Sequence, residues 1–167
     1  LRYCLVASGR GPTDQEIEHV AEAVRAIKNT VPIEICCSLG LLTEEKAKKL
    51  KAAGVDRVNH NLNTSEEFYS EICATHTYRD RIETIRNARS AGLEICSGGI
   101  VGMGEADSDL IAMGHAVREL GCDSVPINFL HPIPGTPLEN EKNLDPVRGL
   151  KILCLFRFLN PRTEIRI

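Results

Sequence analysis

A glycine followed by an apolar residue and then an acidic one recurs three times along this chain. The triplets are Gly54-Val55-Asp56, Gly92-Leu93-Glu94 and Gly121-Cys122-Asp123, so the glycines are 38 and 29 residues apart. Each glycine follows a stretch with helical periodicity, and glycine readily takes the left-handed conformation that ends a helix. A strand-like run follows each triplet, and the intervals are about one β-α unit long. The repeat therefore predicts a parallel sheet with helices packed outside it.

The rest of the chain continues this alternation of strands and helices. Helix starts are indicated by the capping box Thr13-Asp14-Gln15-Glu16, by Thr43 and Thr77, and by Asp145-Pro146, and a further helix spans about 107–120. The predicted strands are 1–6, 33–38, 55–62, 93–99, 122–129 and 163–167.

An eight-fold β/α barrel typically needs ~250 residues. The 167 residues of this chain therefore fit about six of eight β-α units, which predicts a partial TIM-type barrel. We expect a single domain over residues 1–167, truncated at both ends. A complete, doubly wound open sheet is the alternative.

Composition narrows the class of function. The net charge is −3 and no basic stripe occurs, which argues against a nucleic-acid partner. No apolar run approaches the ~18 residues of a membrane span. The seven cysteines occur without a secretory context, which favours reduced thiols in a cytoplasmic protein, some of them metal ligands.

Three cysteines, Cys4, Cys36 and Cys96, end three separate strand-like runs, 1–4, 33–36 and 93–96. Alternate residues of a barrel strand face the lumen, and the others face the helices and must be apolar. Each of these cysteines shares its parity with polar residues, whereas Cys37 shares its parity with the apolar set of its strand. Parity therefore predicts that Cys36 faces the lumen and Cys37 the core. Three luminal thiolates favour zinc or iron–sulfur. The same parity adds three polar residues to the lumen: Asn61, Asn128 and Arg166.

Each of these interpretations has a structural alternative. A free cysteine in a strand is often a small core residue. Arg166 is also suited to an ion pair with Glu34 or Glu94, since a buried charge needs a partner. The asparagines suit a structural hydrogen-bond network. The glycine-rich run 98–105 is either a loop that lets backbone approach a ligand or a plain β-α turn.

Longer motifs carry a resemblance to a known family. The segments 59–65, 96–105, 125–130 and 135–138 are similar to motifs of the biotin synthase family of radical S-adenosylmethionine enzymes, and the resemblance extends through the whole chain. It implies a barrel enzyme, a sulfurtransferase that converts dethiobiotin to biotin. In that family a [4Fe-4S] cluster cleaves S-adenosylmethionine, the resulting radical abstracts hydrogen from unreactive carbons, and a [2Fe-2S] cluster supplies the sulfur.

The resemblance also implies roles for particular residues and partners. It implies dethiobiotin as substrate, a flavodoxin- or ferredoxin-type reductant, and a homodimer. The [2Fe-2S] ligands would be Cys4, Cys36, Cys96 and Arg166, the substrate-binding residues Asn61 and Asn128, and the residues near S-adenosylmethionine Asn59, Asn63, Arg81 and Ile100.

Two departures from the family pattern stand out. The C-x-x-x-C-x-x-C motif that holds the [4Fe-4S] cluster is absent, and Asn63 stands where some members carry Asp. We therefore expect an internal segment of a longer enzyme, inactive alone. The alternatives are another radical S-adenosylmethionine barrel enzyme, or a non-enzymatic fragment that binds zinc or an iron–sulfur cluster. The amide pair Asn61 and Asn128 suits the ureido ring of dethiobiotin, which argues against a radical S-adenosylmethionine enzyme with a different substrate.

Overall fold

The computed structural model describes residues 1–167, which form two compact units. The first unit comprises Leu1–His60 and Arg79–Cys96, and the second comprises Asn61–Tyr78 and Ser97–Ile167. The expectation of a single domain stays a prediction.

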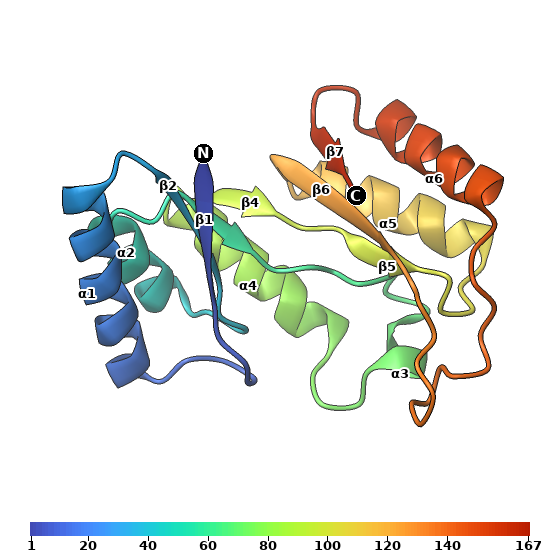
Figure 1. Ribbon diagram of the computed structural model, residues 1–167, viewed down its shortest axis with the longest axis horizontal. Coiled ribbons are helices and arrows are strands. Elements are labelled where there is room, and N and C mark those ends of the chain that lie inside the picture. Colours follow the sequence, from blue (N-terminus) through green and yellow to red (C-terminus); the bar gives the residue numbers. More distant parts are fainter. The chain divides into compact units, whose positions relative to one another are not determined.

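The first unit is a parallel sheet with helices, as the repeat predicts. Its strands are hydrogen-bonded in the order β1, β2, β3, β4 (Figure 1). Helices α1 and α2 lie against each other. The strands are β1 (Arg2–Val6), β2 (Glu34–Ser38), β3 (Arg57–Asn59) and β4 (Glu94–Cys96), and the helices are α1 (Asp14–Thr30), α2 (Glu44–Ala53) and α4 (Tyr78–Ser90).

The strand register of this sheet separates an apolar row from a polar one. Cys37 pairs with Leu5 on one side and Val58 on the other, and Val58 pairs with Ile95. Cys37, Val58 and Ile95 are buried, and Cys37 is 0% exposed. The prediction that Cys37 belongs to the core is therefore confirmed.

Local sequence signals explain where the helices begin. The Thr13 hydroxyl accepts from the Glu16 backbone N–H at 3.2 Å, and the Glu16 carboxylate accepts from the Thr13 N–H at 2.7 Å, which completes the predicted capping box. Thr43 caps α2, and Asp145 caps α6 (Pro146–Leu159), whose first residue is the predicted proline. The repeated glycines all have positive φ, of 105° at Gly54, 78° at Gly92 and 65° at Gly121.

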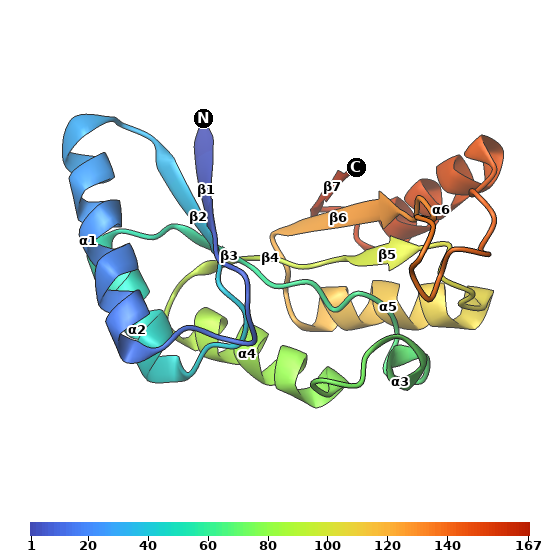
Figure 2. The ribbon, with the colours of Figure 1, turned by 60° about the horizontal axis from the view of Figure 1, so that its bottom comes forward.

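In the second unit, strand β6 pairs in parallel with both β5 and β7. Helices α5 and α6 lie against each other (Figure 2). Asn160, which ends α6, donates to the carbonyl oxygen of Gly114 in α5 at 3.1 Å, so a buried hydrogen bond joins these two helices. The strands are β5 (Gly99–Val101), β6 (Ser124–Phe129) and β7 (Glu164–Arg166), and the helices are α3 (Tyr69–Ile72), α5 (Asp107–Glu119) and α6.

The structure differs from the sequence prediction in the fourth strand. The predicted run 93–99 is interrupted after Cys96, so that β4 and β5 belong to different units. The backbone N–H of Ser97 donates to the carbonyl oxygen of Ser124 at 2.9 Å, which redirects the chain to β6. Strand β3 is also shorter than predicted, and Asn63 beyond it has a left-handed φ of 74°. The four-residue helix α3 is too short to show a period in the sequence.

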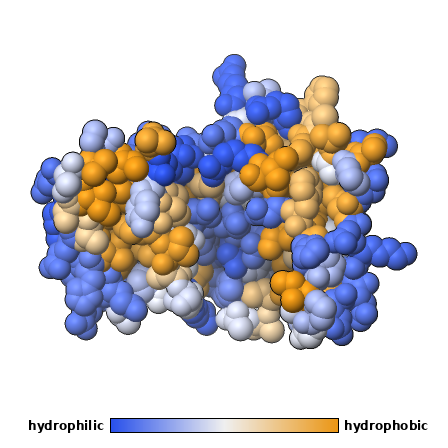
Figure 3. Space-filling view, viewed as in Figure 1, coloured by the Kyte–Doolittle hydropathy of each residue, from blue (hydrophilic) through white to orange (hydrophobic).

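Large apolar side chains are exposed on both units (Figure 3). Tyr3 and Val6 are exposed on β1, which is hydrogen-bonded only to β2 within its unit, so its outer edge carries unpaired backbone groups. Val147, Leu150 and Phe158 are exposed on α6. No helix combines the length and the apolar character that crossing a bilayer requires.

Gly98 gives a first testable prediction. A β-carbon at this position would collide with the carbonyl oxygen of Pro126, because β6 passes directly against the Gly98 backbone. We expect Gly98→Ala to lower the free energy of unfolding by about 1–3 kcal/mol, the usual cost of overpacking. Urea unfolding of the protein measures this loss.

The matched control is Gly149→Ala in α6, where the new β-carbon would meet the Phe129 ring at an ordinary 3.4 Å. This change should leave stability equal or slightly higher, because alanine favours a helix interior. Equal stability of the two variants would contradict the close approach at Gly98.

Candidate functional site

Three of the predicted ligands lie on the polar face of the first unit's sheet. Cys4 of β1 and Cys36 of β2 are register partners, and neighbouring strands are about 4.8 Å apart, so their thiols are adjacent. Cys96 ends β4, two residues beyond Glu94 and on the same side of the strand, since side chains alternate. Cys36 is 5% exposed and Cys96 is buried, whereas Cys4 is exposed.

Burial keeps the thiol of Cys36 protonated in the absence of a cation. Burial, and next the neighbouring Cys4 thiol, raises the pKa of Cys36 to about 12, with a smaller contribution from Cys96. Burial likewise raises the pKa of Cys37 to about 12. A thiophilic metal that replaces the proton at Cys36 would supply positive charge directly at the sulfur atom.

The donor chemistry of the three cysteines fits an iron–sulfur cluster. Soft thiolates are the ligands of such clusters, and they come here from separate strands of one sheet. No three Cys, His, Asp or Glu side chains converge closely enough to hold a metal ion. A two-iron cluster accepts ligands that are further apart than those of a single ion, because each iron binds its own pair.

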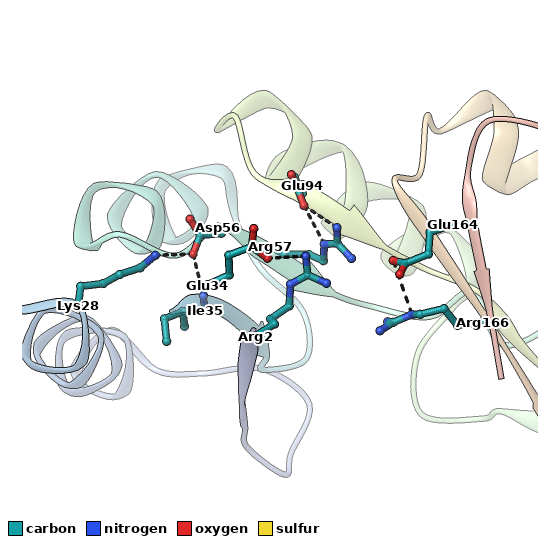
Figure 4. A network of polar contacts seen from close by, with 9 residues as sticks. All are labelled: Arg2, Lys28, Glu34, Ile35, Asp56, Arg57, Glu94, Glu164 and Arg166. Atoms are coloured by element: carbon teal, nitrogen blue, oxygen red, sulfur yellow. Dashed lines mark hydrogen bonds and ion pairs between the residues drawn. The ribbon is translucent and has the colours of Figure 1, made fainter. Parts of the chain in front are cut away.

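The same face carries two ion pairs, Arg57 with Glu94 and Arg2 with Glu34 (Figure 4). Arg57 donates from Nε and Nη2 to the same oxygen of Glu94, at 2.9 and 2.6 Å. Arg2 Nη2 lies 2.7 Å from Glu34 Oε2. Glu34 and Glu94, the two glutamates that the sequence analysis considered as ion-pair partners of Arg166, thus have arginine partners within the first unit.

Arg166, the fourth predicted ligand, belongs to the second unit. It lies on β7, and its Nε is 3.8 Å from Glu164 Oε2 (Figure 4). Its side chain is partly exposed. Its role as a cluster ligand stays a prediction.

The predicted substrate amides converge on one glycine pair of the second unit. Asn61 Oδ1 accepts from the backbone N–H of Gly98 at 3.2 Å, and Asn128 Nδ2 donates to the carbonyl oxygen of Gly99 at 3.4 Å. The backbone of Asn63 joins the same segment, since its N–H donates to the carbonyl oxygen of Gly98 at 3.1 Å. These bonds support the structural alternative for the asparagines, although each side-chain amide both donates and accepts and can serve a ligand as well.

The residues expected near S-adenosylmethionine are divided between the units. Asn59 is half-buried on β3, in register with Cys96, and Arg81 lies on α4, both in the first unit. Ile100, half-buried on β5, and Asn63 lie in the second unit, where the N–H of Ile100 donates to the carbonyl oxygen of Asn63 at 2.9 Å. Asn63 and Ile100 are thus joined by a backbone hydrogen bond.

Two carboxylates fix the loops around this segment, and the sequence reasoning missed both. Glu105 accepts from the N–H groups of Gly102 and Met103, each at 2.8 Å, so the glycine-rich run has a defined loop conformation. Asp109, almost fully buried, accepts from the Ser65 hydroxyl at 2.5 Å and from the Ala106 N–H at 2.8 Å. The sequence signal that could have indicated these bonds is the spacing, since each carboxylate lies two or three residues after a backbone amide that it binds.

The comparisons with known proteins decide the family. Residues 1–117 match the Radical SAM superfamily. The chain belongs to this superfamily. Residues 126–167 match a second family model, the Biotin and Thiamin Synthesis associated domain.

Among individual superfamily relatives, the chain is 52% identical to a biotin synthase of Sulfurihydrogenibium sp. and 55% identical to one of Macrococcus caseolyticus. Each match covers 99% of this chain and 50% of the relative, so the chain spans about half the length of these proteins.

Two solved structures show the same fold. Methylornithine synthase matches with a TM-score of 0.86 at 22% identity, over 98% of this chain and 49% of that one. The FeFe-hydrogenase maturase HydG from Carboxydothermus hydrogenoformans matches with a TM-score of 0.81 at 23% identity, over 98% of this chain and 41% of that one. The predicted fold class, a partial TIM-type barrel, is confirmed.

Outside this site, Cys73 has an environment opposite to that of Cys36. Its Sγ lies 3.6 Å from both Thr75 Oγ1 and His76 Nδ1. Burial opposes ionisation of this thiol, but hydrogen bonds from the Thr75 and Tyr69 side chains outweigh it and lower the pKa of Cys73 to about 7.

Thiol alkylation tests this difference. We expect the rate of iodoacetamide modification at Cys73 to rise with pH through about 7, because the thiolate is the nucleophile. Thr75→Val removes a hydrogen bond to the thiolate and should move this rise to higher pH. Mass spectrometry of the labelled peptides measures both rates, and an equally fast reaction at the buried Cys37 would contradict the assignment.

Proposed function

We propose that this chain is part of a biotin synthase, a sulfurtransferase that converts dethiobiotin to biotin. The observation that carries the proposal is the 52–55% identity to biotin synthases over 99% of the chain. Since the chain spans about half of those proteins, the activity belongs to a longer chain that includes this one. Membership of the Radical SAM superfamily supports S-adenosylmethionine and iron–sulfur clusters as cofactors.

In this proposal Cys4, Cys36, Cys96 and Arg166 hold a [2Fe-2S] cluster. The adjacent thiols of Cys4 and Cys36, and the position of Cys96 on the same sheet face, support it. When bound, the cluster supplies the sulfur atom that is inserted into the substrate. The protein's part is to bury the ligands, since Cys36 and Cys96 are shielded from water, and to hold them on separate strands of a rigid sheet.

The second unit would bind the substrate. Asn61 and Asn128 are suited to the ureido group of dethiobiotin, because an amide matches its N–H donors and its carbonyl acceptor. The bare backbone of Gly98 and Gly99 lets a ligand approach closely. Asn59, Asn63, Arg81 and Ile100 would contact S-adenosylmethionine.

The remaining elements complete the proposed enzyme. The [4Fe-4S] cluster that cleaves S-adenosylmethionine would be held by residues outside this chain, within one radical-SAM-type barrel domain. A flavodoxin- or ferredoxin-type protein would deliver electrons, and the enzyme would work as a homodimer. We place it in the cytoplasm, where its seven free cysteines stay reduced.

Cluster reconstitution tests the ligand assignment. We expect the full-length enzyme that contains this chain to show a [2Fe-2S] absorption spectrum after anaerobic reconstitution with iron and sulfide. Cys36→Ala should abolish this spectrum, because it removes one of the two adjacent thiols on the polar face.

The matched control is the neighbouring Cys37→Ala, whose side chain lies in the apolar row. It should retain the spectrum even if it lowers stability. Loss of the cluster in Cys37→Ala with retention in Cys36→Ala would overturn the assignment, and absence of the cluster in the parent enzyme would overturn the proposed site.

Steady-state kinetics test the substrate amides. We expect Asn128→Ala to raise the KM for dethiobiotin about tenfold, the loss that corresponds to ~1.4 kcal/mol, because it removes a hydrogen bond to the ureido group. The side chain is exposed, so the melting temperature should change little.

Asn140→Ala, at an exposed position in the same unit, is the control and should leave the KM unchanged. An unchanged KM in Asn128→Ala together with a lower melting temperature would instead assign the amide to its bond with Gly99.

A further inference from the structure

Arg57 is a buried cation within the row of cysteines. It lies on β3, and its register partners are Cys36 on one side and Glu94 on the other. Cys4 continues the row beyond Cys36, and Cys96 lies two residues beyond Glu94 on the same side of β4. The two strands that pair with β3 on either side of Arg57, β2 and β4, thus each carry a predicted cluster ligand. It is 6% exposed, although arginine is almost never fully buried unless it is paired.

Glu94 restrains the orientation of this guanidinium. Both Nε and Nη2 donate to the single oxygen Glu94 Oε2, at 2.9 and 2.6 Å (Figure 4). The burial is unequal, because 8% of the Arg57 side chain and 51% of the Glu94 side chain are exposed. Water therefore screens the carboxylate far more than the guanidinium, and the positive charge acts more strongly on its buried surroundings.

The cysteines need such a charge once they are ionised. Three thiolates carry three negative charges, and the cluster core of the proposed site compensates these only in part when the iron is reduced. An uncompensated charge is costly in a buried position such as those of Cys36 and Cys96. The reduction potential of a cluster follows its net charge and the charges around it, so a nearby cation favours the reduced form.

We propose that Arg57 is the charge-compensating residue of the Cys4, Cys36 and Cys96 site, and that Glu94 positions it. This inference rests on the proposed function, since it requires a cluster at these cysteines. Arg57 is a positioning and electrostatic residue that does not ligate the metal. Its removal should make the cluster harder to reduce without changing the ligand set.

A redox titration of the reconstituted full-length enzyme tests the proposal. We expect Arg57→Met, which keeps much of the length and apolar stem of the side chain, to lower the ratio of reduced to oxidised [2Fe-2S] cluster at least tenfold at a fixed potential. For a one-electron couple this corresponds to about 59 mV. Arg57→Lys keeps the charge and should stay close to the parent enzyme. Absorbance and electron paramagnetic resonance follow the titration.

The matched control is Lys28→Met, which breaks another ion pair of the same unit, 2.6 Å long, between Lys28 and Asp56. It should leave the potential unchanged while lowering stability, so it separates loss of an ion pair from loss of this particular charge. If Arg57→Met is too unstable to reconstitute, Glu94→Gln keeps the guanidinium buried and removes its carboxylate. That variant should make the cluster easier to reduce.

The outcomes separate this inference from the proposed function. A parent enzyme that forms the cluster, with the same potential in Arg57→Met as in Lys28→Met, would overturn the role of Arg57 and leave the cluster site intact. An unchanged potential in Glu94→Gln would likewise count against it. A parent enzyme without a [2Fe-2S] cluster would overturn the proposed site itself.

Discussion

The in-register pairing of four parallel strands is the constraint on which the candidate cluster site depends. The register of β1 to β4 aligns one row of polar residues across the sheet and an apolar row next to it. The polar row contains Cys4, Cys36, Arg57 and Glu94, and the apolar row contains Leu5, Cys37, Val58 and Ile95. A slip of one residue in any strand would exchange the faces of that strand's side chains. The apolar row disfavours such a slip, since the slip would remove Ile95 or Val58 from that row and put a charged side chain in its place. The packing of the core thus also fixes the chemistry of the opposite face.

A second constraint is the absence of side chains at Gly98 and Gly99. The backbone here is so close to Pro126, Met113 and Asn63 that a β-carbon would collide with each of them. The close approach lets Asn61, in the loop after β3, and Asn128 of β6 bind the same short segment. In a barrel enzyme the ends of the strands carry the reactive groups, so a segment defined by its neighbours in this way is well suited to hold a ligand in one orientation.

Much of the fold was predictable because its signals are local. The capping box at Thr13, the proline at Pro146 and the glycines after α2, α4 and α5 act within one turn of backbone, and all were found where the sequence placed them. The boundary between β4 and β5 was not predictable from strand propensity. It depends on a hydrogen bond from the backbone N–H of Ser97 to the carbonyl oxygen of Ser124, which is 27 positions further along the chain. The loop carboxylate Glu105 was missed because its partners are backbone amides, for which its spacing is only a weak signal. Asp109 was missed because one of its partners, Ser65, is 44 positions away in the sequence.

The sequence by itself determined the residue types, their parity and the family resemblance. Parity separated Cys36 from Cys37, because side chains alternate in every strand whatever the tertiary structure. Only the tertiary structure decided which residues share a row and how charges pair. It assigned Glu94 to Arg57 and Glu34 to Arg2, and it placed Arg57 beside Cys36 in the register. The physical reason is that parity is a property of one strand, whereas register and ion pairing depend on how separate strands align, which no single stretch of sequence records.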